Sequence, residues 1–274
     1  MKFSILTPAY NSGLFIEQCL NSFQQNDYWE KEQIVVDGKS TDQSHMILDK
    51  YRKNYKNLKW IKAYDSGQSN ALNIAMQASQ GDVIGWLNAD EMYLPNTLNL
   101  VSELFERNPT KDVIFGDTIF CDAKGNAIRL KSSYPFSKTT LYFYGAYIST
   151  CSFFLKSSSL KFLKQPKFNE DLEFSMDWDF FIALSKANVN FHYVPKPLGI
   201  FRVHEDAKTF DGNSPEIILE RKKVVLLNSL GKSSTNPLWR IWHGLLKIIH
   251  GSYVREVAFG IAQIHGKKNT TARS

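Results

Sequence analysis

The chain has 274 residues, of which 43% are hydrophobic and 14% aromatic, so it can bury a sizeable core, and global disorder is not expected. It carries 33 basic and 27 acidic residues, and the net charge of +6 suits anionic partners such as nucleotide phosphates, anionic lipid or nucleic acid without choosing among them. The three cysteines, Cys19, Cys121 and Cys151, form no CxxC pair, which argues against a zinc knuckle or a disulfide framework and favours a reducing cytosol.

The first part of the chain alternates short apolar runs with segments of helical spacing. We expect strands at 3–6, 33–36, 58–61, 83–87 and 113–115, and helices at 14–25, 41–55, 69–78 and 96–107. The run at 83–87 is uniformly apolar, as in a parallel sheet covered on both faces. This alternation predicts a doubly wound α/β sheet, in which ligands bind at the carboxyl ends of the strands.

The pattern changes beyond residue 115. We expect a hairpin formed by 114–120 and 127–130, a helix at 177–187, and short strands at 191–194 and 198–203. The segment 237–264 combines aromatic and basic residues in the pattern of an amphipathic helix. Such a helix would either lie on an anionic membrane surface or pack on the rest of the domain. No stretch approaches the ~18 uncharged apolar residues of a membrane span.

Polar residues follow four of the expected strands, at 7–11, 37–42, 65–70 and 88–91. Because the carboxyl ends of parallel strands meet at one edge of a sheet, we expect these segments to converge on one site. The last of them, Asn88-Ala89-Asp90-Glu91, offers the hard oxygen ligands that Mg²⁺ or Mn²⁺ prefers. The alternative is an acidic turn before the helix that Pro95 opens.

Asp37 directly follows the strand expected at 33–36, and Asp65 begins the polar segment that follows the strand expected at 58–61. Asp37 precedes the positions that cap a helix, so we expect it to accept from a base N–H or a ribose hydroxyl, whereas Ser40, Thr41 and Asp42 are expected to cap the next helix. In the Asp65 segment, Gly67 would let the backbone approach a ligand, and Ser69 can cap the helix that follows.

Asp177 and Asp179 flank a tryptophan at the start of a helix. One of them could serve as a general base, or both could simply favour the helix dipole. Arg202 lies near the end of the last expected strand, where an arginine can form a surface ion pair. His204 follows this strand, and a lone histidine is more often structural than a ligand.

Taken together, these segments resemble the family 2 glycosyltransferases, which are inverting enzymes with the GT-A fold. The resemblance covers about residues 2–210. Its motifs are SILTPAYN at 4–11, IVVDGKSTD at 34–42, DSGQ at 65–68 with ALN at 71–73, GWLNADE at 85–91, MDWDF at 176–180 and FRVH at 201–204.

The resemblance implies a role for each matched residue. Asp177 would be the catalytic base, with Asp179 as a second carboxylate nearby. A divalent cation, Mn²⁺ or Mg²⁺, would be held by Asp90, Glu91 and His204, and Arg202 would contact the diphosphate. The residues that would bind the nucleotide sugar are Thr7, Pro8, Ala9, Tyr10, Asn11, Asp37, Asp65, Gly67, Gln68, Asn70, Asn73, Asn88, Ala89 and Asp90.

The implied activity is transfer of a sugar from a nucleotide-diphosphate donor to a saccharide or lipid-linked saccharide, in cell-surface polysaccharide biosynthesis. Asn88 replaces the first Asp of the family's DxD motif, and Glu91 stands where a second Asp is common. Gly38 replaces a common Asp, and Met176 replaces the Glu before the base. Because of Asn88 and Glu91, the alternative is a non-catalytic nucleotide-sugar or glycan-binding protein on the same fold. No nucleic-acid partner is expected, because the sequence lacks an RNP-like, zinc-finger or basic-helix signature.

The expected fold class is α/β, a GT-A (Rossmann-like), mostly parallel sheet flanked by helices, with a C-terminal helical extension. We divide the chain into a nucleotide-sugar-binding half at 1–115, an acceptor-binding and catalytic half at 116–210, and a helical extension at 211–274 with a flexible tail. The expected location is the cytoplasm, with peripheral attachment at the inner face of the cell membrane through 237–264.

Overall fold

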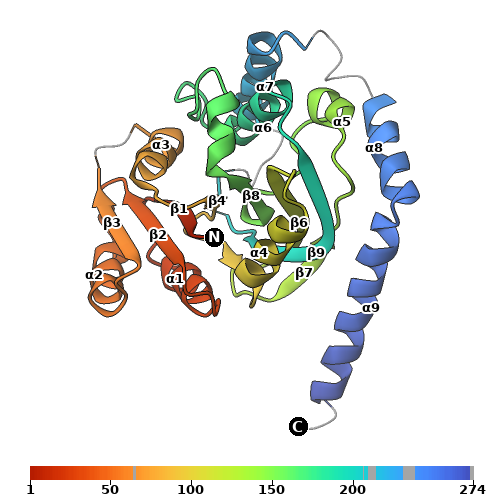
Figure 1. The fold of residues 1–274 in the computed structure, drawn as a ribbon. Helices are drawn as coiled ribbons and strands as arrows, with labels where there is room; N and C mark the ends of the chain where they lie inside the picture. Colours follow the sequence, from red (N-terminus) through yellow and green to blue (C-terminus); the bar gives the residue numbers. More distant parts are fainter. Residues whose placement is uncertain (64–65, 206, 209–213, 231–237, 272–274) are drawn as a thin grey trace.

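The structure, a computed structural model, describes residues 1–63, 66–205, 207–208, 214–230 and 238–271, with side chains in the last range as far as residue 263. Within these residues nine strands form one sheet in the order β3-β2-β1-β4-β8-β6-β9-β5, and β7 pairs with β6 (Figure 1). The strands are β1 (Phe3–Ala9), β2 (Lys31–Asp37), β3 (Leu58–Lys62), β4 (Val83–Trp86), β5 (Met92–Tyr93), β6 (Val113–Cys121), β7 (Ala127–Lys131), β8 (Phe153–Lys156) and β9 (Phe191–Arg202).

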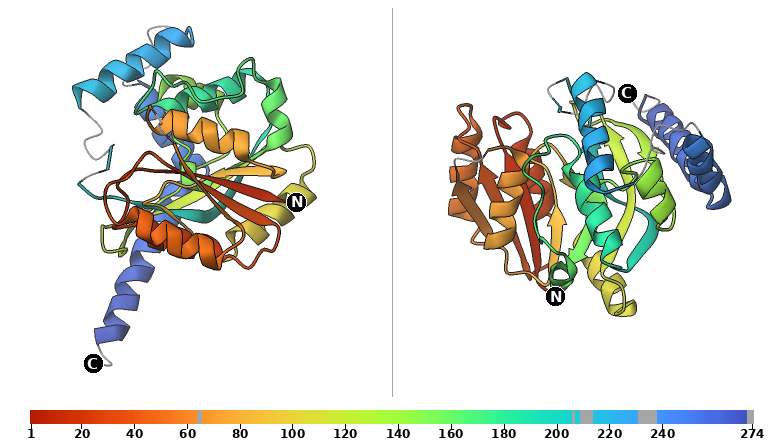
Figure 2. Two further views of the ribbon diagram at one scale, coloured as in Figure 1. Left: turned by 90° about the vertical axis from the view of Figure 1, so that its left-hand side faces the viewer. Right: turned by 90° about the horizontal axis from the view of Figure 1, so that it is seen from above.

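Helices cover both faces of the sheet. They are α1 (Ile16–Gln24), α2 (Ser44–Asn54), α3 (Gln68–Ala78), α4 (Thr97–Arg107), α5 (Lys138–Phe143), α6 (Met176–Lys186), α7 (Pro215–Leu227), α8 (Leu238–Ile249) and α9 (Ser252–Thr271), with 3₁₀ turns η1 (Thr150–Ser152) and η2 (Ser157–Phe162). Helices α3 and α6 lie on one face, and α1, α2 and α4 lie on the other (Figure 2). The domain is therefore a three-layer α/β structure.

Side chains that alternate along β1 supply the two layers of core. Leu6 packs with α3 and α6 on one face, whereas Phe3 and Ile5 pack with α1 and α4 on the other. This is the two-residue period of a strand buried on both sides. The strands β3, β2, β1 and β4 are mutually parallel, as expected for the first part of the chain. Strand β8 then runs antiparallel between β4 and β6, so the second part of the sheet is mixed.

Several element boundaries differ from those that the sequence predicts. Helix α2 begins at Ser44 rather than at residue 41, because Asp42 accepts hydrogen bonds from the backbone N–H groups of Ser44 at 2.9 Å and Gly13 at 2.7 Å. Asp42 thereby joins two loops instead of starting the helix at Thr41. Helix α4 begins at Thr97 after Asn96 in the left-handed region at φ +63°, so Pro95 precedes the helix.

Strand β9 is continuous where two short strands were expected. Pro195 and Pro197 lack the N–H that a sheet requires, and this suggests an interruption. In the structure the register between β6 and β9 shifts on either side of Asp117, which lies opposite Pro197. Pro195 has no partner on β6 in this register, and Pro197 lies at the irregular position itself. The predicted hairpin is confirmed as β6 and β7.

The expected C-terminal amphipathic helix is two helices. Gly251, with φ +65°, separates α8 from α9, because this backbone conformation ends a helix and favours glycine. Both helices run along one side of the domain (Figure 1). Tyr134 and Nδ1 of His243 form a 2.6 Å hydrogen bond, and Arg255 donates to the buried Asp117 at 3.3 Å. Within the described residues, no helix is long and apolar enough to span a membrane.

Candidate active site

The loop after β1 forms one wall of the site. Thr7, Pro8 and Ala9 lie within β1 and are buried, whereas Tyr10 is 65% exposed. Asn11 has φ +46°, and its Oδ1 accepts from the backbone N–H of Thr41 at 2.8 Å. An open hollow next to this contact is bordered by Asn11, Leu14, Thr41, Asp42 and Gln43. The loops after β1 and β2 therefore meet, as their positions in the sequence predict.

Asp37 ends β2 with its side chain completely buried. Its Oδ2 lies 2.6 Å from Nε2 of His45, and its Oδ1 accepts from the hydroxyl and the backbone N–H of Ser40. His45, on the first turn of α2, is about a third exposed and packs at 5.4 Å from the Trp60 ring. Both carboxylate oxygens of Asp37 are thus bound by side chains of the protein, one by His45 and the other by Ser40. No motif in the sequence pointed to His45, since a helical histidine is usually a surface residue.

The residues expected from α3 divide into two groups. Gln68 reaches toward β4, where its Nε2 donates to Oδ1 of Asn88 at 2.8 Å, and the Trp86 indole donates to the same oxygen at 2.8 Å. Asn70 and Asn73 instead bind Glu170, at 2.9 and 2.8 Å. Gly67 precedes the helix with φ +125°. Asp65 lies outside the described residues.

Asn73 and Ser69 fix the loop before α6. The side chain of Asn73 both donates to the carbonyl of Phe168 and accepts from its N–H, at 3.0 and 2.7 Å. The Ser69 hydroxyl donates to the carbonyl of Leu172 at 2.9 Å, so Ser69 does not cap α3. These bonds span about 100 residues of sequence, and they position the segment that leads into Asp177. In this structure Asn73 is a positioning residue.

Asp90 and His204 come together from distant parts of the chain. Nε2 of His204 lies 3.0 Å from Oδ2 of Asp90, and the two side chains are 10% and 29% exposed. The other imidazole nitrogen, Nδ1, is buried and forms no hydrogen bond with any described residue. The Phe15 ring packs against the imidazole at 4.5 Å. The Asp90 carboxylate and Nε2 of His204 are thus in direct contact, and this pair is the part of the expected cation site that the structure brings together.

Glu91 faces the interior, although it was expected beside Asp90 as a metal ligand. It is 1% exposed, its Oε2 accepts from the Asn88 N–H at 2.9 Å, and its Oε1 accepts from the Thr150 hydroxyl at 3.4 Å. Burial, and secondarily the negative charge of Asp90, raise the pKa of Glu91 to about 8. Glu91 closes the turn after β4, and its carboxylate is not presented beside that of Asp90.

Arg202 is buried and is 1% exposed. Its Nε donates to the Asp90 carbonyl at 3.1 Å, and its terminal nitrogens donate to the carbonyls of Asp122 and Ala123, to Gln18 and to the sulfur of Met92. All five guanidinium donors therefore have protein acceptors. We expected Arg202 to contact a diphosphate, but in this structure it holds the loop that carries Asp90.

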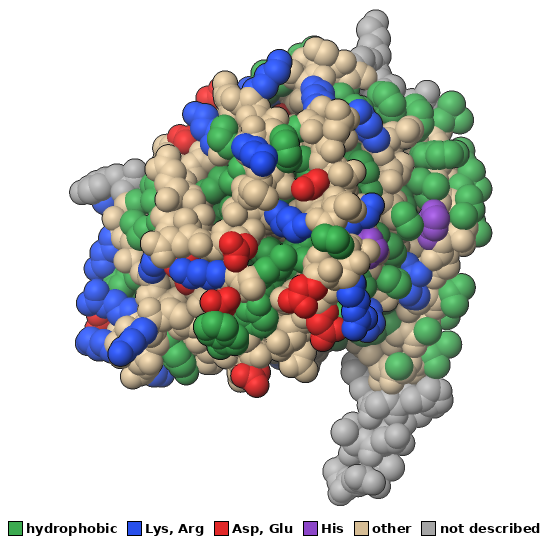
Figure 3. Space-filling model, in the orientation of Figure 1, with side chains coloured by type: hydrophobic (Ala, Val, Ile, Leu, Met, Phe, Trp, Pro, Cys, Tyr) green, Lys and Arg blue, Asp and Glu red, His purple; other side chains and the backbone are tan. Residues whose placement is uncertain are grey.

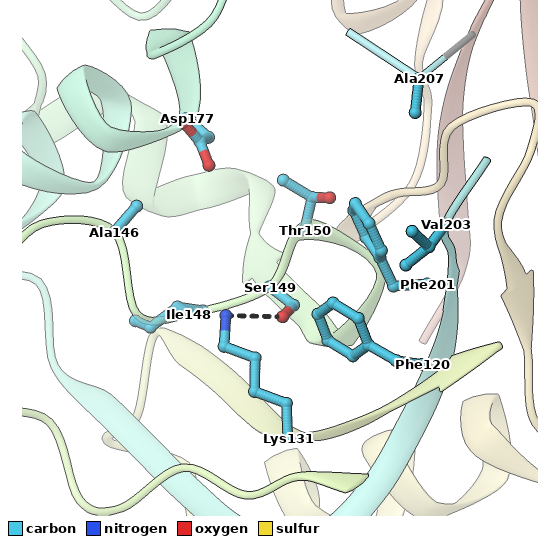
Figure 4. Close-up of a pocket in the computed structure, with 10 residues that line it drawn as sticks. All are labelled: Phe120, Lys131, Ala146, Ile148, Ser149, Thr150, Asp177, Phe201, Val203 and Ala207. Carbon is cyan, nitrogen blue, oxygen red and sulfur yellow. Dashed lines mark hydrogen bonds between the residues drawn. The ribbon is translucent and has the colours of Figure 1, made fainter. Parts of the chain in front are cut away.

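Asp177 and Lys131 line a cavity of about 290 Å³ (Figure 4). Asp177 comes from the first turn of α6, and Lys131 from the end of β7. The remaining lining residues are Phe120, Ala146, Ile148, Ser149, Thr150, Phe201, Val203 and Ala207. Thr150 bonds Glu91 and Val203 precedes His204, so this cavity adjoins the loop that carries Asp90.

The environment of Asp177 suits a general base. Burial raises the pKa of Asp177 to about 6. Two weaker effects oppose this rise: the Trp178 N–H donates to Oδ1 of Asp177 at 2.7 Å, and Lys131 contributes a positive charge. Asp179 is different, because its Oδ1 accepts from the Asn228 amide at 2.6 Å and it does not line the cavity. The structure thereby distinguishes the two carboxylates that the sequence left open.

Only two side chains of the expected cation site, Asp90 and His204, converge. Within the described part of the chain, no group of three or more His, Cys, Asp or Glu side chains could hold a metal ion by itself. Mg²⁺ and Mn²⁺ are commonly bound through one or two protein ligands together with substrate phosphates. The pair therefore fits a cation that arrives with a diphosphate, and it does not fit a permanent metal centre.

Comparison with known proteins identifies the family. The sequence model of glycosyl transferase family 2 matches residues 4–185, which is most of the domain described above. The chain belongs to this family. The matched region includes every strand end of the site except the one that carries Arg202 and His204.

The curated relatives of this family 2 glycosyltransferase include two bacterial enzymes that are named for polymers. Poly(ribitol-phosphate) beta-N-acetylglucosaminyltransferase TarS of Staphylococcus aureus is 36% identical over 102 residues, which are 36% of this chain and 18% of TarS. Chondroitin synthase of Escherichia coli is 25% identical over 184 residues, which are 67% of this chain and 26% of that protein. The chain thus spans about a quarter or less of the length of these two relatives.

Solved structures share the fold. TarS 1–349 with UDP-GlcNAc superposes with a TM-score of 0.66 at 23% identity, covering 84% of this chain and 67% of that one. The mannosyltransferase PcManGT of Pyrobaculum calidifontis, with GDP-Man and Mn²⁺, superposes with a TM-score of 0.59 at 15% identity, covering 96% and 80%. At these identities the likeness concerns the fold alone, and it confirms the expected GT-A architecture of this family 2 glycosyltransferase.

Proposed function

We propose that this chain transfers a sugar from a nucleotide diphosphate to a hydroxyl of a saccharide or lipid-linked saccharide, with inversion at the anomeric carbon. The observation that carries the proposal is the position of Asp177 in a cavity that adjoins the Asp90–His204 pair. An inverting transfer requires one base beside the acceptor and a separate group that stabilises the leaving diphosphate. Asp177 and the Asp90–His204 pair would fill these two roles.

The chemical step would proceed by direct displacement. The acceptor oxygen attacks the anomeric carbon as the bond from that carbon to the diphosphate oxygen breaks. Asp177 takes the hydroxyl proton, and the nucleoside diphosphate leaves with the electron pair of the broken bond. A carboxylate whose pKa is about 6 is ionised near neutral pH, yet it is more basic than an ordinary aspartate. Both properties favour its role as the base.

Asp90 and His204 would hold a divalent cation together with the diphosphate, and that cation would offset the negative charge on the leaving group. Arg202 supports this arrangement by binding the Asp90 carbonyl. The loops after β1 and β2, with Tyr10, Asn11 and Asp37, would receive the nucleotide. Gln68 and Asn88, which are hydrogen-bonded to each other, would contact the donor sugar.

The names of relatives support a role in the assembly of cell-surface polymers. TarS is named for poly(ribitol-phosphate), and a further relative, from Staphylococcus epidermidis, is a teichoic acid poly(glycerol phosphate) polymerase that is 27% identical over 205 residues. The structures with UDP-GlcNAc and with GDP-Man make these two donors the first to be tested.

The experiment is a donor-turnover assay with UDP-GlcNAc and GDP-Man in the presence of Mn²⁺, with mixed oligosaccharide acceptors, using wild type, Asp177→Asn and Asp90→Ala. The proposal requires turnover by the wild type and a large loss in both variants. If all three proteins bind the donor and none turns it over, the chain is a nucleotide-sugar-binding protein. That alternative is favoured by Asn88, whose side-chain oxygen is occupied by Gln68 and Trp86.

We also propose that the chain attaches to an anionic membrane surface through an apolar stripe on α8 and α9. The stripe consists of the exposed residues Leu238, Ile241, Trp242, Leu245, Ile248, Ile249, Tyr253, Val254, Val257 and Ile261. Green side chains mark it along the edge that these helices form in Figure 3. The opposite side of α8 packs on the domain through His243 and Trp239, which stack on Tyr144 and Phe143.

Charge favours a membrane as the occupant of this stripe. Between residues 238 and 271 the sequence has five basic residues, Arg240, Lys247, Arg255, Lys267 and Lys268, and one acidic residue, Glu256. Glu256 accepts from Lys247 at 2.6 Å and is therefore paired. An amphipathic segment with exposed apolar side chains and a basic excess is typical of binding to anionic lipid.

A further inference from the structure

Lys131 lies in the cavity opposite Asp177 and extends from the last residue of β7. Figure 4 shows its ammonium and the Asp177 carboxylate directed into the same space from different elements. The ammonium donates to the Ser149 hydroxyl at 3.2 Å. Within the described residues no carboxylate forms an ion pair with it. Two of its three donors are therefore available to a molecule in the cavity.

Burial of this cation without an anionic partner is unfavourable. Burial, and secondarily the charge of Arg129, lower the pKa of Lys131 to about 8, and the charge of Asp177 opposes this change. Arg129, two residues earlier on β7, is not a buried cation, because it is exposed and stacks on the Phe120 ring at 3.9 Å. Lys131 is instead held in a site where an incoming anion would be its first full partner.

The rest of the cavity wall suits a sugar. The rings of Phe120 and Phe201 lie 4.9 Å apart and present apolar surface beside Lys131, while Ser149 and Thr150 add hydroxyl groups. Apolar surface with a few polar groups is the usual composition of a small-molecule site. A polymer unit that carries both hydroxyls and an anionic group would match this combination.

We infer that Lys131, with Ser149, binds an anionic group of the acceptor, a phosphate or a carboxylate, beside the hydroxyl that Asp177 deprotonates. This inference rests on the proposed function, because it assumes that the cavity is the acceptor site. Lys131 would thus select charged acceptors over neutral ones. The cation contributes to selection because an ammonium and an anion in a desolvated cavity attract more strongly than they do in water.

A binding experiment tests the inference without requiring turnover. The full chain is loaded with UDP and Mn²⁺ to occupy the donor side, and glucose 6-phosphate, glucuronate and glucose are titrated separately. The variants are Lys131→Met, which keeps the length of the side chain, and Lys131→Arg, which keeps the charge. We expect the wild type to bind one or both anionic sugars about tenfold or more tightly than glucose. Lys131→Met should lose this preference, and Lys131→Arg should retain most of it.

Two results would overturn the inference. One is a wild type that shows no preference for either anionic sugar, and the other is a Lys131→Met variant that keeps the preference. If Lys131→Met instead weakens the binding of UDP itself, Lys131 contacts the donor diphosphate and the inference is also wrong. Thermal unfolding serves as the folding control, since the loss of an unpaired buried cation should not lower the melting temperature. Failure of the donor-turnover assay alone would refute the proposed function and leave this result intact.

Discussion

Nε2 of His204 lies 3.0 Å from Oδ2 of Asp90, although 114 residues separate them in the sequence. This contact holds the end of β9 against the turn after β4. Arg202, two residues before His204, adds a second contact by donating to the Asp90 carbonyl. The two side chains therefore act as one unit, and the cation site that we propose depends on both.

Replacement of either member of the pair should weaken cation-dependent donor binding. We expect His204→Ala and Asp90→Asn each to reduce the affinity for Mn²⁺ in the presence of UDP by about tenfold or more. His250→Ala is the matched control, because His250 is an exposed histidine in the turn after α8. The measurement is a calorimetric titration of Mn²⁺ into each protein in the presence of UDP. Equal affinities in His204→Ala and His250→Ala would remove His204 from the site.

Asp177→Asn should lose activity and gain stability. The loss should be about 100-fold or more, because asparagine cannot accept the proton. The carboxyl pKa rises from 3.8 to about 6 on folding, so the ionised form is unfavourable in the folded state. Removing that charge should stabilise the protein near neutral pH by up to ~3 kcal/mol.

The matched control for this prediction is Asp179→Asn. The asparagine oxygen at that position can still accept from Asn228, so activity should remain close to that of the wild type. Chemical denaturation and transfer rates measured on the same preparations provide the test. A larger loss of activity in Asp179→Asn than in Asp177→Asn would exchange the two assignments.

The pH dependence of transfer should have an acidic limb near pH 6. Because the pKa of Asp177 is raised to about 6, the base becomes protonated and inactive as the pH falls through this value. The charged groups that act on it are Lys131 from β7 and Arg221 from α7, and both lower its pKa. Lys131→Met should therefore move the limb to higher pH. The measurement is kcat/KM across the acidic range, and a limb that stays in place in this variant would contradict the assignment of Asp177.

The same titration contributes to stability with a defined sign. The folded-state pKa is higher than the unfolded value, so the folded protein binds this proton more tightly. The contribution is most favourable below about pH 4 and is lost as the pH rises through about 6.

Arg202→Met should destabilise the domain by about 2–5 kcal/mol, because it leaves several partly buried acceptors without the donors that the buried guanidinium supplies. Two of these acceptors are the carbonyls of Asp90 and Ala123. Urea unfolding would measure the loss. Arg129→Met is the control and should have a small effect, because Arg129 is an exposed residue of β7. If Arg202 contacts the diphosphate and has no structural role, the variant will lose donor affinity without losing stability.

Membrane attachment should depend on the apolar stripe of α8 and α9. We expect the wild type to float with vesicles that contain phosphatidylglycerol, and to float less with phosphatidylcholine alone. The double variant Leu245→Glu and Ile248→Glu should remain in solution, whereas Ile128→Glu, at an exposed position on β7, should float like the wild type. If the stripe instead joins two copies of the chain, the wild type will elute as a dimer and the double variant as a monomer.

The sequence by itself determined the family, the parallel first part of the sheet and most of the elements. Uniform apolar runs and helical spacing are local patterns, and they identify the strands and helices before any contact is known. The strand-end motifs were also visible, and the prediction that the loops after β1 and β2 would meet is confirmed by the contact between Asn11 and Thr41. The roles assigned to these residues remain predictions.

The tertiary structure decided what each polar residue faces. Glu91 and Asp90 are neighbours in the sequence, yet one carboxylate points inward to Asn88 and the other toward His204. Lys131 had no signal at all, because a lysine at the end of a strand is ordinarily a surface residue. Its importance arises from the long-range packing of β7 against the turn that carries Ser149, and from α6, which brings Asp177 to the same cavity. Burial and charge environment depend on contacts between distant segments, so local sequence patterns do not reveal them.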